Sequence, residues 1–368
     1  MTKAAIVTST RAYERWLRGQ LRGDIVRKDL RKKHEKMADA PFSFLRATYW
    51  RWAETALEVC PELATAPTVL AVGDIHLENF GTWRDQQGRL VWGVCDFDEA
   101  ARMPYALDVA RLATSALLSR PDLGATDDTC PAILEGYVDG LTAPRPLVLD
   151  AEFGRLRKLV EITDEERAAF WRALATLKRG KPAPKYVAAL RASLPDLEGG
   201  MAVRARRAGV GSLGRPRFVG FGEWRGAPVV REAKAVVASA WIRAYSRGSA
   251  HSRCIEIATG RYRAPDPWYA LTRGVVVRRL SPNNHKIEAD SHADALADPA
   301  VVWAMGHELA AIHLGRGDHL EAIMRDLRGR PDGWLDAAAR RMSDFTCEEQ
   351  ADWKSAWLER GRRSHSEV

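Results

Sequence analysis

The sequence predicts an α+β protein of two lobes, in which a helix-rich lobe comes first, a β-rich lobe second, and C-terminal helices return to the first lobe. Three observations favour this order. Apolar residues recur every three or four positions over 156–174, as in an amphipathic helix. Strand-like runs separated by a short turn follow at 217–234. Between them, Lys178–Pro184 and Leu197–Gly200 contain helix-breaking glycine and proline, which predicts the boundary between the lobes.

Length and composition bound the class of protein. The 368 residues suffice for two lobes with a sizeable core, and we expect domains at residues 1–198, 199–290 and 291–368. The 46% of hydrophobic and 28% of charged residues are ordinary for a soluble globular protein. No apolar run approaches the roughly 20 residues of a membrane span, and no signal segment opens the chain. The sequence therefore predicts a cytoplasmic protein with no membrane partner.

Cysteine usage and charge argue against several other classes. The five cysteines are scattered and form no Cys-x-x-Cys pair, so they indicate neither a disulfide framework nor a zinc site. The net charge of +8 gathers at 27–36 and 204–207, and the first cluster is typical of the solvated face of a basic helix. Aromatic residues do not interleave with these clusters, and no nucleic-acid-binding module is present, so nucleic acid is not a favoured partner.

Two acidic segments carry the strongest functional signal. Asp74 follows the apolar run 68–72, which predicts a strand, and Asn79 comes five residues later. Residues 83–90 have a polar centre with glycine between apolar flanks, which predicts a hairpin connection. This hairpin would return Asp96 to the side of Asn79, with Asp98 just beyond.

Phosphoryl transfer needs residues of these types in one small volume. A base must lie near the acceptor hydroxyl, and oxygen ligands must hold the magnesium ions that bridge the ATP phosphates. We therefore expect Asp74 to be the base, and Asn79 and Asp96 to bind magnesium. Asp98 either assists the metal or is a surface charge. A lone Gly-Asp pair is more often a capped turn, and only its combination with Asn79 and Asp96 favours catalysis.

A helix is predicted to start near Pro104, and it carries Asp108 in its first turn. Two interpretations of this carboxylate stay open. Asp108 could accept backbone N–H bonds from the catalytic loop, or it could be an N-terminal charge favoured by the helix dipole.

These motifs resemble known families. The loop sequence Gly-Asp-x-His-x-x-Asn of aminoglycoside and choline kinases, a branch of the protein-kinase-like superfamily, is similar to residues 73–79. A closer resemblance, to the bacterial family DUF2252, rests on residues 42–46, 73–81 and 96–99, and extends over about Pro41 to Asp318. The resemblance implies a kinase-like fold but names no substrate.

A kinase site also needs a glycine-rich loop and a strand lysine. Gly209, Gly211, Ser212 and Gly214 form a segment in which backbone N–H groups could approach phosphate oxygens unobstructed. Two strand-like runs separated by a turn follow, and the second ends in Lys234, which would contact the ATP phosphates. Such glycines alone are more often a flexible turn, and a dinucleotide fold would require a strand before them and a helix after them, the reverse of this order.

In ordinary kinases the glycine-rich loop and the lysine precede the catalytic loop, whereas here they follow it. The resemblance therefore implies a circular permutation. Residues 1–198 would form the helical catalytic lobe with the catalytic loop and metal-binding hairpin, 199–290 the β-rich nucleotide-binding lobe, and 291–368 helices that pack on the catalytic lobe. Residues 303–313 resemble the helix that leads into the catalytic loop of unpermuted relatives.

Two further features are open. Residues 275–282 are either a strand that leaves into a hinge beside the adenine or an edge strand ended by proline. As the acidic partner of Lys234 we name Glu256, which follows at a plausible distance. Glu232 is the other candidate, since it lies two residues before Lys234 and faces the same side of the strand. Either carboxylate could instead be a solvated charge.

The sequence thus predicts an ATP- and Mg²⁺-dependent phosphotransferase that acts on a hydroxyl of a small molecule or a protein. It does not name the acceptor or the oligomeric state, nor does it separate phosphoryl from nucleotidyl transfer. One alternative is a binuclear metallophosphoesterase that binds metal through Asp74 and His76, although the other ligand motifs of that class are missing and Leu77 replaces a glycine. A second alternative is a catalytically inactive, kinase-like nucleotide-binding protein.

Overall fold

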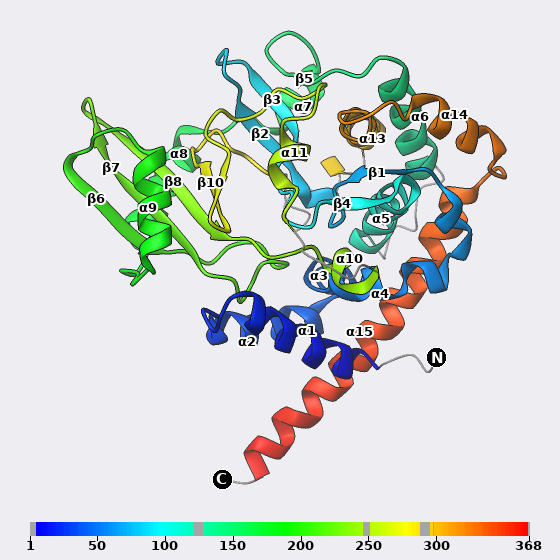
Figure 1. Ribbon diagram of the computed structural model, residues 1–368, viewed down its shortest axis with the longest axis horizontal. Helices are drawn as coiled ribbons and strands as arrows, with labels where there is room; N and C mark the ends of the chain where they lie inside the picture. The colour runs from blue at the N-terminus through cyan, green and yellow to red at the C-terminus, as the bar shows by residue number, and fades with distance from the viewer. Residues whose placement is uncertain (1–4, 121–127, 246–250, 288–294, 297, 367–368) are drawn as a thin grey trace.

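The structure, a computed structural model, describes residues 5–120, 128–245, 251–287, 295–296 and 298–366. Helices and three sheets make up the described part of the chain, a mixed composition compatible with the α+β class. Figure 1 shows a large sheet on one side and a mainly helical region on the other. We call this second region, with its two small sheets, the helical body.

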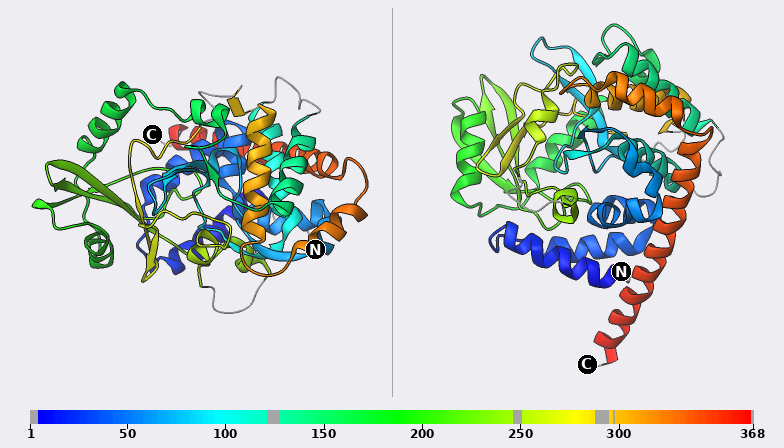
Figure 2. Two further views of the ribbon diagram at one scale, coloured as in Figure 1. Left: turned by 90° about the horizontal axis from the view of Figure 1, so that it is seen from above. Right: turned by 45° about the vertical axis from the view of Figure 1, so that its right-hand side comes forward.

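The helical body is built from the two ends of the chain. Its C-terminal helices pack onto N-terminal ones, α13 against α6 and α15 against α5 and α2. Figure 2 shows α15 running along one side of the body, with its C-terminal end projecting beyond it. The helices of the body are α1 (Ile6–Gln20), α2 (Arg27–Asp39), α3 (Pro41–Ala47), α4 (Tyr49–Val59), α5 (Tyr105–Ser119), α6 (Thr129–Thr142), α13 (Pro299–His313), α14 (Leu320–Gly329) and α15 (Trp334–Ser366), with 3-10 turns at η1 (Pro61–Thr65) and η2 (Leu77–Asn79).

Glycines allow α6 and α13 to pack unusually closely. A Cβ atom on Gly136 of α6 would overlap the carbonyl oxygen of Trp303, and one on Gly140 would overlap that of His307. From the other side, a Cβ atom on Gly306 of α13 would overlap the carbonyl oxygen of Ile133. Only residues without a side chain let two helix backbones approach to this distance. This contact fixes α13 beside the strands that carry the acidic segments.

Two small sheets hold the acidic segments. The strand β1 (Thr68–Ala71) pairs antiparallel with β4 (Ala101–Pro104). The strands β2 (Phe80–Arg84) and β3 (Leu90–Val94) form an antiparallel hairpin, to which β5 (Leu147–Val148) adds a short third strand. The predicted strand at 68–72 and the predicted hairpin connection at 83–90 are therefore confirmed.

The large sheet has the order β6-β7-β8-β10-β9 and is antiparallel throughout. The predicted pair of strands before Lys234 is confirmed, because β7 and β8 meet at a tight turn in which Arg225 and Gly226 have positive φ. The strand β10 lies between two others, so the edge-strand interpretation of 275–282 is wrong. The strands are β6 (Glu198–Ala205), β7 (Arg217–Trp224), β8 (Ala227–Ala235), β9 (Ala270–Thr272) and β10 (Val275–Arg279).

Five further helices of the described residues lie between β5 and β9 in the chain. They are α7 (Gly154–Leu159), α8 (Asp164–Ala175), α9 (Pro184–Ser193), α10 (Ala240–Tyr245) and α11 (Cys254–Ala258). The predicted helix at 156–174 is two helices, because Thr163 caps α8 through a capping box with Glu166. The helix α9 packs on β7, β8 and β10, although it precedes the expected boundary at residue 198. Residues around the other expected boundary, 288–294, lie outside the described part.

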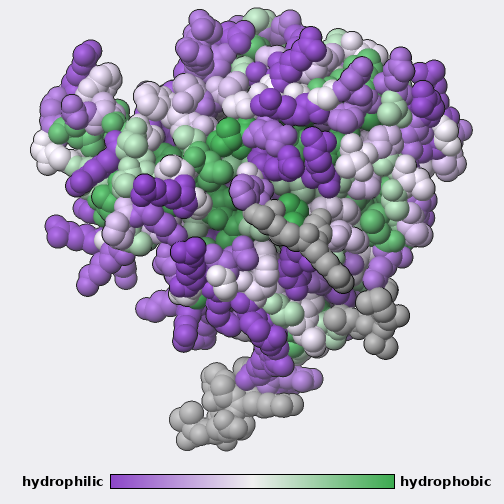
Figure 3. Space-filling model, viewed as in Figure 1, coloured by the Kyte–Doolittle hydropathy of each residue, from purple (hydrophilic) through white to green (hydrophobic). Residues whose placement is uncertain are grey.

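Among the residues that the structure describes, hydrophobic side chains form one large core and two small ones. The large core runs through α4, α5, α6 and α13 and reaches the inner strands of the large sheet, whereas a small cluster of Leu174, Val219, Val230 and Leu280 lies under α8. In the face shown in Figure 3 the surface is mainly hydrophilic, and hydrophobic residues gather near the middle of the view, where Figure 1 places β10 and α11. No helix in the described ranges is both long and apolar enough to span a membrane.

Candidate functional site

A cavity of about 350 Å³ lies where the large sheet meets the helical body. Its volume is within the range of small-molecule sites. Acidic residues line it from the loops after β1 and β3, and basic residues line it from the large sheet and from α2. Charged residues of its lining are Lys33, Arg46, Asp74, Glu78, Asp96, Asp98, Glu99, Arg206, Arg215, Arg217, Arg263, Asp266, Arg278, Arg279 and Lys286, which is nine cations and six anions.

The loop after β1 is held by Asp108 of α5. The carboxylate of Asp108 accepts the backbone N–H groups of Val72 at 2.6 Å and Gly73 at 2.9 Å, and its third partner is the His313 ring at 3.2 Å. Of the two interpretations of Asp108, the structure therefore shows the loop acceptor. Gly73 has φ of +83°, and a Cβ atom there would overlap the Glu99 carbonyl oxygen. This turn places Asp74 at the cavity wall.

Asp74 is paired with a buried arginine. Nη2 of Arg111, which is fully buried on α5, donates to Oδ1 of Asp74 at 2.5 Å. Burial raises the pKa of Asp74 to about 6, with Glu99 and Asp96 acting in the same direction and Arg111 opposing them. Asp74 is therefore a carboxylate of moderately increased basicity in a cavity wall, as a general base requires.

Asn79 ties the two acidic segments together. Its Nδ2 donates to the backbone oxygens of Asp74 at 3.1 Å and Asp96 at 3.3 Å, which leaves Oδ1 as the atom able to take a cation. In addition, the backbone N–H of Cys95 donates to the Asn79 carbonyl oxygen at 3.0 Å. The expected return of Asp96 to the side of Asn79 is therefore found.

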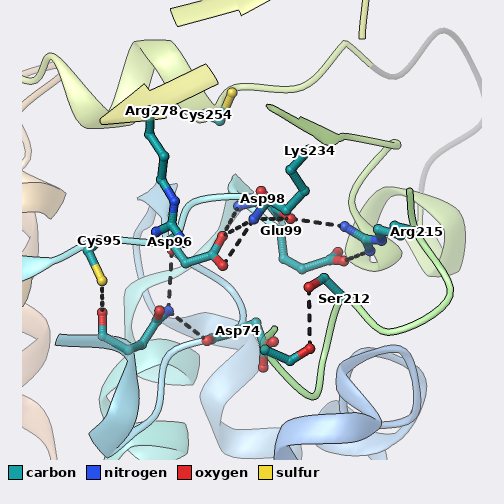
Figure 4. A network of polar contacts seen from close by, with 12 residues as sticks. Asp74, Cys95, Asp96, Asp98, Glu99, Ser212, Arg215, Lys234, Cys254 and Arg278 are labelled. Carbon is teal, nitrogen blue, oxygen red and sulfur yellow. Dashed lines mark hydrogen bonds and ion pairs between the residues drawn. The ribbon is translucent and has the colours of Figure 1, made fainter. Parts of the chain in front are cut away.

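Lys234 lies between two carboxylates (Figure 4). Its Nζ is 3.0 Å and 3.1 Å from the two oxygens of Asp96, and 2.7 Å from Oδ2 of Asp98. Burial opposes ionisation of Asp96, but the charges of Lys234, Lys286, Arg278 and Arg217 outweigh it and hold the pKa of Asp96 well below its usual range. Burial, followed by the neighbouring Asp96, raises the pKa of Asp98.

The acidic partner expected for Lys234 needs correction. Glu256 lies on α11, where its carboxylate pairs with Arg253 at 2.6 Å, and it is not among the residues that line the cavity. Among the described residues, the partners of Lys234 are Asp96 and Asp98. Glu256 follows Lys234 at a suitable sequence distance. Its side chain nevertheless pairs with Arg253, three residues earlier at the start of the same short helix.

Glu232 serves another group of cations. It is fully buried, and it accepts from Arg217 and Arg278 at 2.8 Å each and from Arg206. Burial would raise the pKa of Glu232, but these three arginines hold it well below its usual range. One carboxylate thus holds three guanidinium groups at the cavity wall. Arg206 comes from the loop after β6, Arg217 from β7 and Arg278 from β10. We call these three residues the arginine triplet.

The glycine-rich loop, residues 209–214, lies directly over Asp74. A Cβ atom on Gly211 would be 3.1 Å from Oδ2 of Asp74 and 3.0 Å from the Arg46 carbonyl oxygen. Gly209 and Gly214 have φ of +70° and +96°, conformations that favour glycine. Oγ of Ser212 accepts from Arg217 of the arginine triplet at 2.6 Å. The loop therefore covers Asp74 closely, and a side chain at Gly211 would push the loop away from this carboxylate.

Asp98 also belongs to a network of largely buried residues in the cavity wall. Arg215 donates to Asp98 at 3.2 Å and to Glu99 at 2.7 Å, and the other oxygen of Glu99 accepts the backbone N–H of Ala240 at 2.6 Å. Oδ1 of Asp98 is buried and has no hydrogen-bond partner among the described residues. The interpretation of Asp98 as a surface charge is therefore wrong.

Several site residues escaped the sequence analysis. Arg111 follows Asp108 by three positions on α5, so both side chains lie on the same face of the helix. Asp108 holds the loop and Arg111 binds Asp74, and this spacing could have been recognised in the sequence. Arg215, directly after the glycine-rich loop, and Lys33, on α2, carry no motif that would single them out. Glu99 lies in the acidic segment 96–99, but nothing in the sequence assigns it a role.

His76, the second metal ligand of a phosphoesterase site, has an unfavourable environment for a cation. Burial, followed by the charges of Arg46, Arg111 and Lys286, holds the pKa of His76 well below its usual range. Its ring meets that of Phe42 edge-on at 6.4 Å. A divalent ion at His76 would add its charge to three neighbouring cations.

The acidic half of the cavity lies in the part of the chain that matches a known family. Residues 25–143 match DUF2252. The description of this family is "Uncharacterized protein conserved in bacteria", and the match supports the resemblance over these residues, a shorter range than Pro41 to Asp318. No curated protein and no solved structure matches the chain. The matched part contains Asp74, Asn79 and Asp96, whereas the glycine-rich loop and Lys234 lie outside it.

The residues fit a magnesium-bound nucleotide. Asn79 Oδ1, the Asp96 carboxylate and the unpartnered Oδ1 of Asp98 are the hard oxygen ligands that Mg²⁺ prefers. Within the described ranges, no group of three or more His, Cys, Asp or Glu side chains is arranged so that it could hold a metal ion by itself. Magnesium that arrives with ATP takes one or two protein carboxylates and completes its shell with phosphate and water oxygens. The arginine triplet and Lys234 match the negative charge of the phosphates.

Proposed function

We propose that the protein is an ATP- and magnesium-dependent phosphotransferase with a circularly permuted, kinase-like arrangement, and that it acts on a hydroxyl group. The observation that supports this proposal best is the position of Lys234. Its ammonium group is within hydrogen-bond distance of both Asp96 oxygens, although the two residues are 138 positions apart in the chain. A lysine on a sheet opposite a metal-binding aspartate is the arrangement that kinase chemistry uses.

Each residue would then have a defined task. Asn79, Asp96 and Asp98 would hold magnesium, which when bound neutralises charge on the phosphates. Lys234 would exchange part of its contact with Asp96 for phosphate oxygens, and the arginine triplet would bind the remaining phosphate charge. Asp74 would orient the acceptor hydroxyl and take its proton, while Arg111 fixes the carboxylate orientation. The glycine-rich loop would exclude water from this point.

Magnesium-dependent nucleotide binding tests the proposal most directly. We expect the wild-type protein to bind ATP more tightly with magnesium than with EDTA, and Asp96→Ala to lose the magnesium-dependent part. The control is Asp344→Ala, an exposed aspartate on α15, remote from the cavity. Circular dichroism of each variant checks folding.

Three outcomes separate the candidate functions. Magnesium-dependent binding with turnover of an acceptor supports the phosphotransferase. Binding without turnover of any acceptor or of water supports the catalytically inactive nucleotide-binding protein. Equal affinity of wild type and Asp96→Ala for ATP, in the presence of magnesium, would contradict both.

A further inference from the structure

A group of buried hydrogen-bond donors lies at the end of the cavity beside Asp74. It consists of Lys33 of α2, Arg46 of α3 and Trp50 of α4, which all line the cavity. The Lys33 ammonium lies 4.8 Å from the Trp50 ring and donates to the carbonyl oxygen of Gly211. Gly211 lies over Asp74 and beside the backbone carbonyl oxygen of Arg46. We call Lys33, Arg46 and Trp50 the donor corner.

The donors of this corner are not all used within the protein. Nε of Arg46 and Nε1 of Trp50 are buried and have no hydrogen-bond partner in the described protein. The Lys33 ammonium has three protons, and one hydrogen bond is formed, to the Gly211 carbonyl oxygen at 2.7 Å. Since buried polar groups in proteins are nearly always satisfied, unused donors on three residues of one cavity lining indicate a ligand that brings acceptor atoms.

The charge of the corner points the same way. Lys33 is 3% exposed, and no carboxylate of the described residues forms an ion pair with it. The carboxylates nearest to Lys33 are engaged elsewhere, because Asp74 pairs with Arg111, Glu99 with Arg215 and Glu14 with His34. Glu78, which lines the same cavity, pairs with Arg46 at 2.5 Å. The corner therefore holds a cation in excess, and a buried cation without an anion is unfavourable.

Titration of Lys33 agrees with this geometry. Burial lowers the pKa of Lys33 to about 7, and the nearby Arg215 acts in the same direction. The groups that face Lys33 are Tyr13 and Glu14 from α1, Asp74 from the loop after β1, and Glu99 with Arg215 from the network around Asp98. The three carboxylates among them partly oppose the lowering of the Lys33 pKa. An anion beside Lys33 would favour its charged form.

We propose that the donor corner binds an anionic group, a carboxylate or a phosphate, of the acceptor whose hydroxyl Asp74 addresses. This inference rests on the proposed function, because it assigns the acceptor class of the same site. Acceptors of this class are hydroxy acids and phosphorylated alcohols. Aminoglycosides and choline, the acceptors named for the kinases that residues 73–79 resemble, are cations, and the corner would repel them.

The anionic groups themselves are the probes. Protein labelled with ¹³C at the lysine ε-carbon is titrated with pH, with and without inorganic phosphate or acetate, after addition of Mg²⁺ and a non-hydrolysable ATP analogue. We expect either anion to raise the pKa of Lys33 by about half a unit or more, and choline chloride to leave it unchanged. The anion with the larger effect distinguishes phosphorylated from carboxylate acceptors. The signal of Lys33 is assigned as the one that disappears in Lys33→Met. Lys32→Met, at an exposed position of the same helix, is the matched control and should keep that signal.

The thermal stabilisation by the same anions gives an independent readout. We expect phosphate or acetate to stabilise the wild type and Lys32→Met alike, and to stabilise Lys33→Met less. A Lys33 pKa that neither anion shifts, or anion stabilisation equal in Lys33→Met and Lys32→Met, would overturn the inference. Either result leaves the proposed function intact as long as the protein binds the ATP analogue with magnesium, so the two failures are distinguishable.

Discussion

At the scale of single residues, the site consists of opposite charges that would be unfavourable apart. Lys234 is 3% exposed and its two carboxylates are its only described ion-pair partners. Such an ion pair gives little net stability, but loss of one partner leaves a buried charge without compensation. Substitutions in this group must therefore be judged by both stability and activity.

The first residue-scale prediction concerns Lys234→Met. We expect this change to lower stability by about 3 kcal/mol or more, because Asp96 and Asp98 lose their shared cation. It should also weaken ATP binding. The double variant Lys234→Met with Asp98→Asn removes one of the uncompensated charges, so its stability should partly recover while ATP binding does not. Urea denaturation and calorimetric ATP titration measure the two effects. If stability and ATP affinity recover together, Lys234 has only a structural role.

A second prediction concerns Lys33 and pH. The folded-state pKa of Lys33 is about 7, against 10.5 for the ordinary side chain, so the unfolded chain binds more protons between these values. The contribution of Lys33 to stability therefore improves as pH rises from about 7 towards 10 and is least favourable below 7. We expect Lys33→Met to stabilise the protein more at about pH 6 than at about pH 9, with a difference of roughly 2 kcal/mol. Denaturation of Lys33→Met and Lys32→Met at both pH values measures it, and equal gains would refute it.

The sequence predicts site residues where the contacts are local, and misses them where they are not. Asn79 lies near Asp74 and Asp96 because one loop and one hairpin connect them, and both have recognisable patterns. Lys33 and Arg215 reach the cavity from distant helices and loops, and nothing in their neighbours along the chain sets them apart from surface cations. Glu256 shows the converse error, since a suitable sequence distance did not correspond to a contact.

At the scale of elements, backbone contact between helices positions the site. The close approach of α6 and α13 at Gly136 and Gly306 places His313, at the end of α13, beside Asp108. Asp108 in turn holds the loop that carries Asp74. The geometry of the site thus depends on a helix pair that does not line the cavity.

The prediction at this scale is that Gly136→Ala is strongly destabilising. The added methyl group overlaps the Trp303 carbonyl oxygen, so the helices must separate, at a cost of about 2–3 kcal/mol. As a control, Gly19→Ala on α1 meets no atom within 4 Å and should be neutral or slightly stabilising. Thermal unfolding of both variants measures the difference. An equal effect of the two substitutions would show that the helix contact is loose.

A further element-scale prediction concerns the glycine-rich loop. Gly211 does not have positive φ, so alanine is allowed by the backbone, but its Cβ would lie 3.1 Å from Oδ2 of Asp74. We therefore expect Gly211→Ala to keep stability within about 1 kcal/mol and to reduce acceptor turnover more than ATP affinity. Turnover and ATP affinity unchanged from wild type would show that the loop does not cover the reacting groups.

Elements with regular patterns were predictable, and those shaped by glycine were less so. The hairpin of β2 and β3 and the pair β7 and β8 follow from alternating runs and turn residues. By contrast β6 begins at Glu198–Gly200, which the sequence marked as a boundary. Gly199 and Gly200 have positive φ and coincide with a register shift against β7, so they bend an edge strand rather than end it.

At the scale of the whole molecule, the cavity joins parts that are distant in the chain. The helical body contributes the acidic groups, and the large sheet contributes two members of the arginine triplet. Lys234 of the same sheet is not itself a lining residue, but it contacts Asp96, which is one. The mixed helix and sheet composition and the separate large sheet follow from the sequence. The arrangement as a permuted kinase-like fold and the domain limits stay predictions, because the order of elements alone does not fix how the parts dock.

The whole-molecule prediction is that Mg–ATP stabilises both parts together. A ligand that binds only the folded state at 100 times its dissociation constant adds about 2.7 kcal/mol. We therefore expect one unfolding transition that shifts to higher temperature with Mg–ATP, and no shift when EDTA removes the metal. Differential scanning calorimetry measures it. A shift of one of two separate transitions would show that the nucleotide contacts only one part.

The position of the site residues along the chain has a consequence for synthesis on the ribosome. Asp96 and Asp98 emerge well over 100 residues before Arg215 and Lys234, and domains tend to fold as they emerge. Until the later cations arrive, two adjacent carboxylates have no counter-charge and resist desolvation. The helical body is itself completed only by α13 and α15, which follow β8 in the chain. We therefore expect this edge to stay hydrated until the large sheet and these last helices have emerged.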